Sequence, residues 1–165
     1  MVTRWLAVLT ILVVALMLAQ LVPYGRDHSN PPDGLVVAFD SPATERLAQR
    51  ACFDCHSNRT RWPWYSAIAP ISWRIQHHVT EGRGKLNFTA FDAASEDAGH
   101  EAGEAGESVT KGSMPPPDYL AMHPEARLSA AESAALAAGL DATFARYRHA
   151  ERGEGGEGGR EDDRR

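Results

Sequence analysis

The sequence predicts an all-α protein in which one apolar helix precedes a small helical module and a polar tail follows it. Three observations support this fold class. Residues 5–22 form an uncharged and mostly apolar run. Helix-start signals occur at Ser41-Pro42 and again at Ser129 and Glu132. No segment shows the alternation of apolar and polar residues that is typical of half-buried strands.

The N-terminal run, from Trp5 to Val22, is long enough to cross a membrane. It contains no charged residue, and at about 1.5 Å per helical residue its roughly 18 residues cover the hydrocarbon core of a bilayer. Trp5 and Tyr24 stand where aromatic side chains meet the two interfaces. A cleaved signal peptide is the alternative, but its apolar region is normally about 7–15 residues long. We therefore expect residues 1–24 to be a retained transmembrane anchor.

Composition divides the rest of the chain into three parts. Residues 25–40 are expected to form a linker, because they begin with a polar stretch that a pair of prolines stiffens. Residues 41–150 are expected to fold around one core. Residues 151–165 consist of Gly, Glu, Asp and Arg, so they lack apolar surface to bury and we expect them to be disordered.

Ser41 and Pro42 predict the first helix of the module. A Ser side chain caps free amides at a helix start, and Pro is favoured at the first helical position. The helix is expected to run into Cys52 and to place Leu47 and Ala51 on one face.

Three more helices are expected further along the module. One spans residues 71–81 and ends at Gly82. Another spans residues 92–111, although each of its internal glycines costs about 1 kcal/mol relative to Ala. A capping box at Ser129 and Glu132 opens the last helix, which should continue to about residue 147. Its apolar face, at spacings of three or four, comprises Leu136, Leu140, Phe144 and Tyr147.

Composition also excludes two classes of protein. Two cysteines in 165 residues exclude a disulfide framework. A net charge of −5 argues against nucleic-acid binding, which requires a basic excess. The charge is uneven, since residues 50–85 are mainly basic and residues 92–107 carry only acidic charges. We expect the basic stretch to steer an acidic partner.

The segment Cys52-Phe53-Asp54-Cys55-His56 predicts the chemistry of the module. Two thiols one helical turn apart can each add to a vinyl group of haem, and the adjacent His56 is then directed at the iron. We therefore predict one covalently attached c-type haem, held by Cys52 and Cys55, with His56 as an axial ligand.

Three other interpretations of the cysteine pair remain open. A thioredoxin-like redox pair would lie near alternating strands and helices, which the sequence lacks. A structural disulfide across this pair would close a very small loop. A zinc site needs four ligands, and Cys52 and Cys55 would require two of the histidines at positions 56, 77, 78 and 123.

Met114 is the candidate for the second axial ligand. It follows Gly112-Ser113 and precedes three prolines, so a non-helical loop would hold it near the iron. A Met thioether raises the reduction potential of a haem. Met122 looks more like a packing residue. The alternatives are an open position or a histidine ligand, namely His77, His78 or His123.

Aromatic and basic residues near the motif are candidate contacts to the cofactor. Trp62 and Trp73 offer large apolar rings. Arg61, with Arg59 and Arg74, offers charge-assisted contacts to the haem propionates. A backbone carbonyl near Pro63 or Pro70 is expected to accept from the second ring nitrogen of His56 and so orient it.

Taken together, these segments resemble a family of bacterial single-haem proteins, the haem-binding domain family, which is related to small c-type cytochromes. The resemblance covers most of residues 45–140 and rests on CFDCHSN at 52–58, RWPWYS at 61–66, APISW at 69–73, GR at 82–83, LNF at 86–88, MPPP at 114–117 and HPEARLS at 123–129. It implies a cytochrome-c-like helical fold, ligation by His56, and Met114 at the position of the second ligand. Two departures are a Gly-rich segment at 92–108 and Gly139 in place of a Trp. We expect Gly139 to loosen the last helix.

The function predicted from these features is electron transfer and not catalysis. With His56 and Met114 both bound to iron, no position is free for a substrate. The anchor would hold the module on the outer face of the bacterial cytoplasmic membrane, near membrane-bound redox partners. The alternative is a haem-based sensor or a peroxidase-like protein, which requires an open or labile sixth position.

Overall fold

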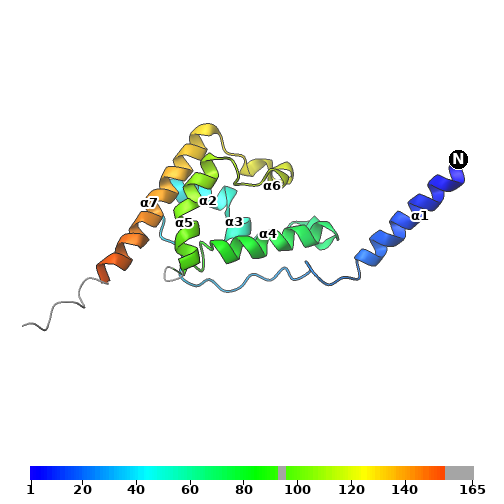
Figure 1. Ribbon diagram of the computed structural model, residues 1–165, viewed down its shortest axis with the longest axis horizontal. Coiled ribbons are helices and arrows are strands. Elements are labelled where there is room, and N and C mark those ends of the chain that lie inside the picture. The colour runs from blue at the N-terminus through cyan, green and yellow to red at the C-terminus, as the bar shows by residue number, and fades with distance from the viewer. Residues whose placement is uncertain (93–95, 155–165) are drawn as a thin grey trace, which may run out of the picture.

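The computed structural model describes residues 1–92 and 96–154, and in this part of the chain the regular structure is helical, without strands. The all-α prediction is confirmed. Figure 1 shows α1 set apart from a compact helical module. The elements are α1 (Val2–Ala19), α2 (Pro42–Ala51), α3 (Phe53–His56), η1 (Trp64–Ala67), α4 (Ile71–Lys85), α5 (Glu96–Thr110), α6 (Pro117–Met122), η2 (Pro124–Ala126) and α7 (Ala130–Glu154).

Helix α1 has the length and hydropathy of a membrane span. Its 18 residues have a mean hydropathy of 2.3, and none of them is buried against the module. A signal sequence near the N-terminus shares these properties, so composition alone leaves both interpretations of residues 1–24 in place.

Residues 25–40, predicted as a linker, lie along the module as an ordered strap. Val37 N donates to Phe88 O at 2.8 Å, and Gly34 N donates to Thr89 O at 2.8 Å. The Val37 side chain is buried in the core. The segment predicted as a linker is therefore ordered by backbone hydrogen bonds to the module. Its polar, Pro-containing composition does not indicate such bonds, because their partners lie far away in the chain.

The core lies where α5 and α7 pack side by side and α2 crosses α7 (Figure 1). Leu136, Leu140 and Phe144 are each at most 1% exposed, which confirms the predicted face of the last helix. Phe53 stacks on Phe88 with 5.5 Å between ring centroids. Phe53 therefore ties the cysteine segment directly to the main core.

Both predicted helix starts are confirmed by their capping bonds. Thr44 N donates to Ser41 Oγ at 3.2 Å. Ser129 N donates to Glu132 Oε2 at 2.8 Å and Glu132 N donates to Ser129 Oγ at 3.2 Å, which together form the capping box.

The ends of two helices differ from the predictions. Helix α4 passes through Gly82 and ends at Lys85. Helix α7 continues to Glu154, past the predicted end at Tyr147 and into the first four residues of the predicted tail. The rest of that tail, residues 155–165, lies outside the described residues.

Gly139 brings helices together and does not loosen them. A Cβ at Gly139 would lie 2.6 Å from Thr44 Cγ2 of α2, and one at Gly106 of α5 would lie 2.9 Å from Ala137 O of α7. Both glycines are therefore sites where helices approach more closely than a side chain would allow. The expected loosening at Gly139 is wrong, because the residue's small size serves the α2–α7 crossing.

Candidate functional site

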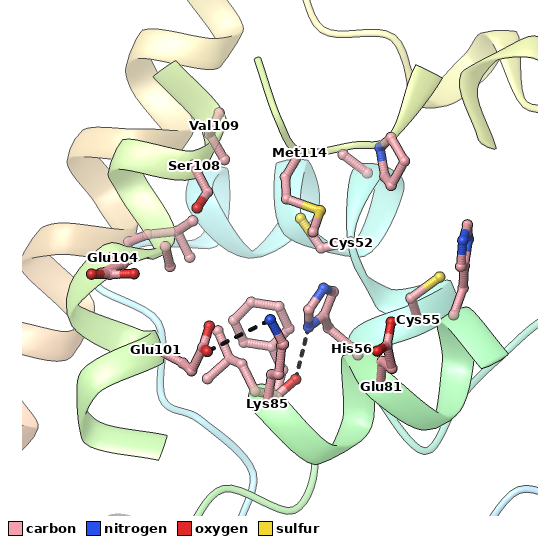
Figure 2. A pocket seen from close by; sticks show the side chains of 18 of the residues that line it. Cys52, Cys55, His56, Glu81, Lys85, Glu101, Glu104, Ser108, Val109 and Met114 are labelled. Atoms are coloured by element: carbon pink, nitrogen blue, oxygen red, sulfur yellow. Dashed lines mark hydrogen bonds and ion pairs between the residues drawn. The ribbon is translucent and has the colours of Figure 1, made fainter. Parts of the chain in front are cut away.

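A cavity of about 360 Å³ opens between α3, α4, α5 and the loop before α6. This volume lies in the range of ~300–1,000 Å³ that is usual for cofactor pockets. Figure 2 shows side chains from all these elements converging on it. The residues of the cysteine segment that line the cavity are Cys52, Cys55 and His56.

The cysteine segment reaches the cavity because the chain turns sharply after α2. Cys52 is the residue between the two helices: it caps the C-terminus of α2 and the N-terminus of α3, with a backbone φ of −123°. His56 N donates to Cys52 O at 2.9 Å, which closes one helical turn. This turn directs both sulfur atoms and the imidazole of His56 toward the same space (Figure 2).

Gly82 allows α4 to pack directly against this turn. A Cβ at Gly82 would lie 2.5 Å from Cys55 O and 3.1 Å from Cys55 Cβ. Any side chain at position 82 would therefore push α4 away from the cysteine segment. This contact explains why a buried glycine lies inside α4 and does not end it.

His56 is oriented by the backbone that follows α4. Its Nδ1 lies 2.9 Å from Leu86 O. Because a carbonyl only accepts, Nδ1 carries the proton and Nε2 keeps its lone pair for a metal. Burial lowers the pKa of His56, partly opposed by its hydrogen bonds to backbone carbonyls, so the ring is favoured in its neutral form. The acceptor expected near Pro63 or Pro70 is therefore wrong, because α4 extends far enough to bring Leu86 under the ring.

The two cysteines are unpaired thiols in the structure. Burial raises the pKa of Cys52 to about 12, with a smaller contribution from Cys55. Burial, followed by the nearby Asp54, raises the pKa of Cys55 to about 11. Both sulfur atoms are therefore protonated at neutral pH, and both residues line the cavity.

Met114 lies on the opposite wall, in the loop between α5 and α6. Its N–H donates to Ser108 O at 3.2 Å, and Gly112 allows the turn with a φ of 71°. Figure 2 shows the Met114 side chain pointing from the loop into the cavity, across from His56. The residue is 38% exposed. The predicted pair of axial ligands therefore lines one cavity.

The alternative histidine ligands lie in different places. His78 lines the cavity. His77 is exposed beside Glu81. His123 pairs with Tyr65 Oη at 2.8 Å and with Glu125 at 3.0 Å, and it lines a second, smaller cavity. In the described part of the chain, no three His, Cys, Asp or Glu side chains form a metal-binding cluster, so the structure does not assemble the zinc alternative.

Arg61, Trp62 and Trp73, predicted as cofactor contacts, are not among the residues that line the cavity. The guanidinium of Arg61 is bound to the Asp54 carboxylate at 3.0–3.1 Å. Trp62 stacks on the His28 ring with 4.7 Å between centroids. Nearness in sequence to the cysteines therefore did not place these side chains on the cavity lining, and their contact with the cofactor stays a prediction.

The other two arginines expected near the propionates also have carboxylate partners. Arg59 pairs with Asp33 at 2.7 Å, and Arg74 pairs with Asp118 at 2.5 Å. Among the described residues, Lys85 is the only Lys or Arg that lines the cavity, and it lies 3.8 Å from Glu101. Lys85 is therefore the cation available to a negative group of a ligand.

Asp54, which lines the second cavity, joins the two walls of the first. Its carboxylate accepts from Tyr119 Oη at 2.8 Å as well as from Arg61. Burial and the adjacent carboxylate raise the pKa of Tyr119, so its hydroxyl stays a donor. Tyr119 lies on α6, just beyond the Met114 loop. No local signal in the sequence indicates this connection, because Asp54 and Tyr119 are 65 residues apart.

The apolar walls of the cavity were also missed from the sequence. They comprise Ala51, Leu86, Phe88, Ala105, Val109 and Leu140. Leu86 and Phe88 fall in one of the segments that carry the family resemblance, so that segment could have indicated them. Apolar walls, an imidazole nitrogen, a thioether and two thiols together suit a flat apolar cofactor that contains iron.

Comparison with known proteins agrees with this chemistry. The model of the haem-binding domain family matches residues 14–142 of the chain. No curated protein and no solved structure shows a significant match.

Proposed function

The chain belongs to the haem-binding domain family, and we propose that it is a membrane-anchored c-type cytochrome that carries one haem and transfers electrons. The observation that carries this proposal is the cavity itself. It gathers Cys52, Cys55 and His56 on one wall and Met114 on the other.

Covalent attachment would use the two thiols. Cys52 and Cys55 would each hold the haem through one thioether, formed by adding S–H across a vinyl group, with the sulfur on one vinyl carbon and the thiol hydrogen on the other. The addition is balanced without an external oxidant. Thioether bonds would retain the cofactor in a small module whose cavity is partly open.

Axial ligation would use His56 and Met114. The Leu86 carbonyl holds the His56 ring so that Nε2 faces the cavity, and the loop presents the Met114 thioether from the other side. When bound, the haem iron supplies one-electron chemistry at a potential that a Met ligand raises. With both ligands in place no iron position is open to a substrate, which favours an electron carrier over an enzyme.

Membrane attachment would use α1. An 18-residue helix of this hydropathy can cross a bilayer once. The module would then lie on the outer face of the cytoplasmic membrane and exchange electrons with protein partners there. Because Arg59, Arg61 and Arg74 are paired with carboxylates, the basic stretch is less able to steer an acidic partner than its sequence indicates.

Covalent attachment is tested by extracting the purified protein, produced with haem-maturation machinery, with acidified acetone. The colour should stay with the protein, and the mass should rise by that of one haem. Cys52→Ser should leave one thioether, and the double variant with Cys55→Ser should release all its haem. Complete release of colour from the unmodified protein would refute the attachment.

The second ligand is tested by comparing Met114→Ala with Met122→Ala. Met114→Ala should change the oxidised spectrum and lower the reduction potential, because a thioether ligand is lost. Met122, which lines the second cavity, serves as the matched control and should leave both unchanged. Rapid carbon monoxide binding to the unmodified reduced protein would contradict His/Met ligation and favour a sensor or a peroxidase-like protein.

A further inference from the structure

The turn at residues 62–73 carries an exposed apolar surface. None of these residues has a charged side chain. Trp64 is 80% exposed, Ile71 50% and Ile68 40%. Large exposed apolar side chains that recur within one short uncharged segment are candidates for a contact with something other than water. We call Trp64, Ile68 and Ile71 the apolar turn surface.

The end of α1 is hydrogen-bonded to this same turn. Gln20 Nε2 donates to Ala69 O at 3.0 Å, and Ala69 N donates to Gln20 Oε1 at 3.1 Å. One amide side chain thus satisfies both backbone groups of a single residue. Figure 1 shows the end of α1 facing the start of α4. The apolar turn surface therefore flanks the point where α1 joins the module.

The chain just beyond α1 is attached to the same end of the module. Gly25 has a φ of 79°, and a Cβ there would lie 2.6 Å from Ser72 O, so this close approach requires glycine. His28 Nε2 lies 3.1 Å from Ser66 O, and its ring stacks on Trp62. The orientation of the module relative to α1 is thus set by several contacts and not by a flexible tether.

The length of α1 determines how deep in the membrane the turn at residues 62–73 lies. Its 18 residues span about 27 Å at 1.5 Å per residue, close to the ~30 Å hydrocarbon core. When α1 spans the bilayer, Gln20 lies at the interface and Ala69 lies there with it. Trp is enriched at this depth because its ring is apolar and its N–H is polar.

We propose that Trp64, Ile68 and Ile71 insert into the lipid interface and hold the module in one orientation on the membrane. This inference rests on the proposed anchoring by α1. Lipid is the occupant that the geometry favours, because the Gln20–Ala69 bonds place the surface at the bilayer and because the turn lacks charge. The cavity would then keep a constant height above the membrane for exchange with membrane-bound partners.

Hydroxyl-radical footprinting of the full-length holoprotein, at one copy per lipid nanodisc, tests the proposal. Trp64 is 80% exposed in the protein alone. Its oxidation rate in the nanodisc should be several-fold lower than the rate expected for a Trp side chain of that exposure. Leu35, which is 60% exposed on the strap, should react as its exposure requires and serves as the control. Oxidation of Trp64 at the full rate would overturn the proposal. Protection seen only in crowded vesicles, and not in single-copy nanodiscs, would overturn it in favour of contact with a second copy.

A variant of Gln20 and an extraction assay separate this proposal from the anchoring on which it rests. Gln20→Leu keeps α1 apolar but removes both bonds to Ala69. Because the contacts of Gly25 and His28 remain, Trp64 should lose part of its protection while the protein stays in the membrane after carbonate washing. Release of the unmodified protein by carbonate would overturn the anchoring and the surface together. Retention of the unmodified protein in carbonate, with its Trp64 unprotected, would overturn the surface alone.

Discussion

The two walls of the cavity are built in different ways. The wall of Cys52, Cys55 and His56 stands on buried structure, with Phe53 in the core, α4 pressed against it at Gly82, and a backbone acceptor under the imidazole. The wall of Met114 is a partly exposed loop, in which the Met114 N–H donates to Ser108 O. The difference indicates that the wall of Cys52, Cys55 and His56 is held rigidly, whereas the Met114 wall is the part that can yield.

The rigid wall is most sharply tested at Gly82. Gly82→Ala places a Cβ within 2.5 Å of the Cys55 carbonyl oxygen, and overpacking of this kind costs typically about 1–3 kcal/mol. We expect a lower free energy of unfolding in urea and less haem attached per protein.

Gly84→Ala is the matched control for this substitution. Position 84 lies in the same helix with nothing within 4 Å of a Cβ, so the change should stabilise the protein by about 0.5–1 kcal/mol. If the two variants had the same unfolding free energy, close packing of α4 on the cysteine segment would be contradicted.

The link between the walls is tested at Asp54. Asp54→Asn weakens the bonds to Arg61 and Tyr119 that connect the rigid wall to α6. Disturbing a buried hydrogen-bonded group costs about 1–3 kcal/mol. Since α6 follows the Met114 loop, the variant should also bind exogenous ligands such as imidazole at the iron more readily, as measured by spectral titration.

Asp33→Asn is the control, because it removes an ion pair with Arg59, whose side chain is 51% exposed. Such surface pairs contribute about 0–1 kcal/mol, and imidazole binding should not change. Equal imidazole affinity in both variants would show that Asp54 does not hold the Met114 side in place.

The smallest expected effect on the free energy of unfolding comes from Glu132, whose partner Arg50 lies next to the rigid wall in sequence. Its bonds to Ser129 and Arg50 lower its pKa from 4.5 to about 2, and Arg50 lies on α2 just before Cys52. Because the folded pKa is depressed, the stabilisation is present above pH 4.5 and is lost as the pH falls toward 2.

Glu132→Gln should flatten this part of the curve of unfolding free energy against pH, measured by denaturant titration at several pH values. Glu45→Gln, an exposed carboxylate on α2, is the control and should keep the wild-type slope. If Glu132→Gln kept the wild-type slope of unfolding free energy against pH, Glu132 would be excluded as the source of that slope.

Local sequence signals determined much of this protein. The capping residues Ser41 and Ser129, the apolar face of α7 and the apolar run of α1 each depend on neighbours within a few positions. The spacing of Cys52, Cys55 and His56 is likewise local, as one helical turn brings them together. Such features could be read correctly because their partners lie nearby in the chain.

Only the tertiary structure decided which distant residues complete the site. It placed Leu86 under His56, set Gly82 against Cys55, and turned Arg61 away from the cavity toward Asp54. Each of these contacts depends on where a helix ends or on which carboxylate from a distant part of the chain lies nearby. Local spacing in the chain set the chemistry of the candidate haem ligands, and packing between distant segments set how firmly each of them is held.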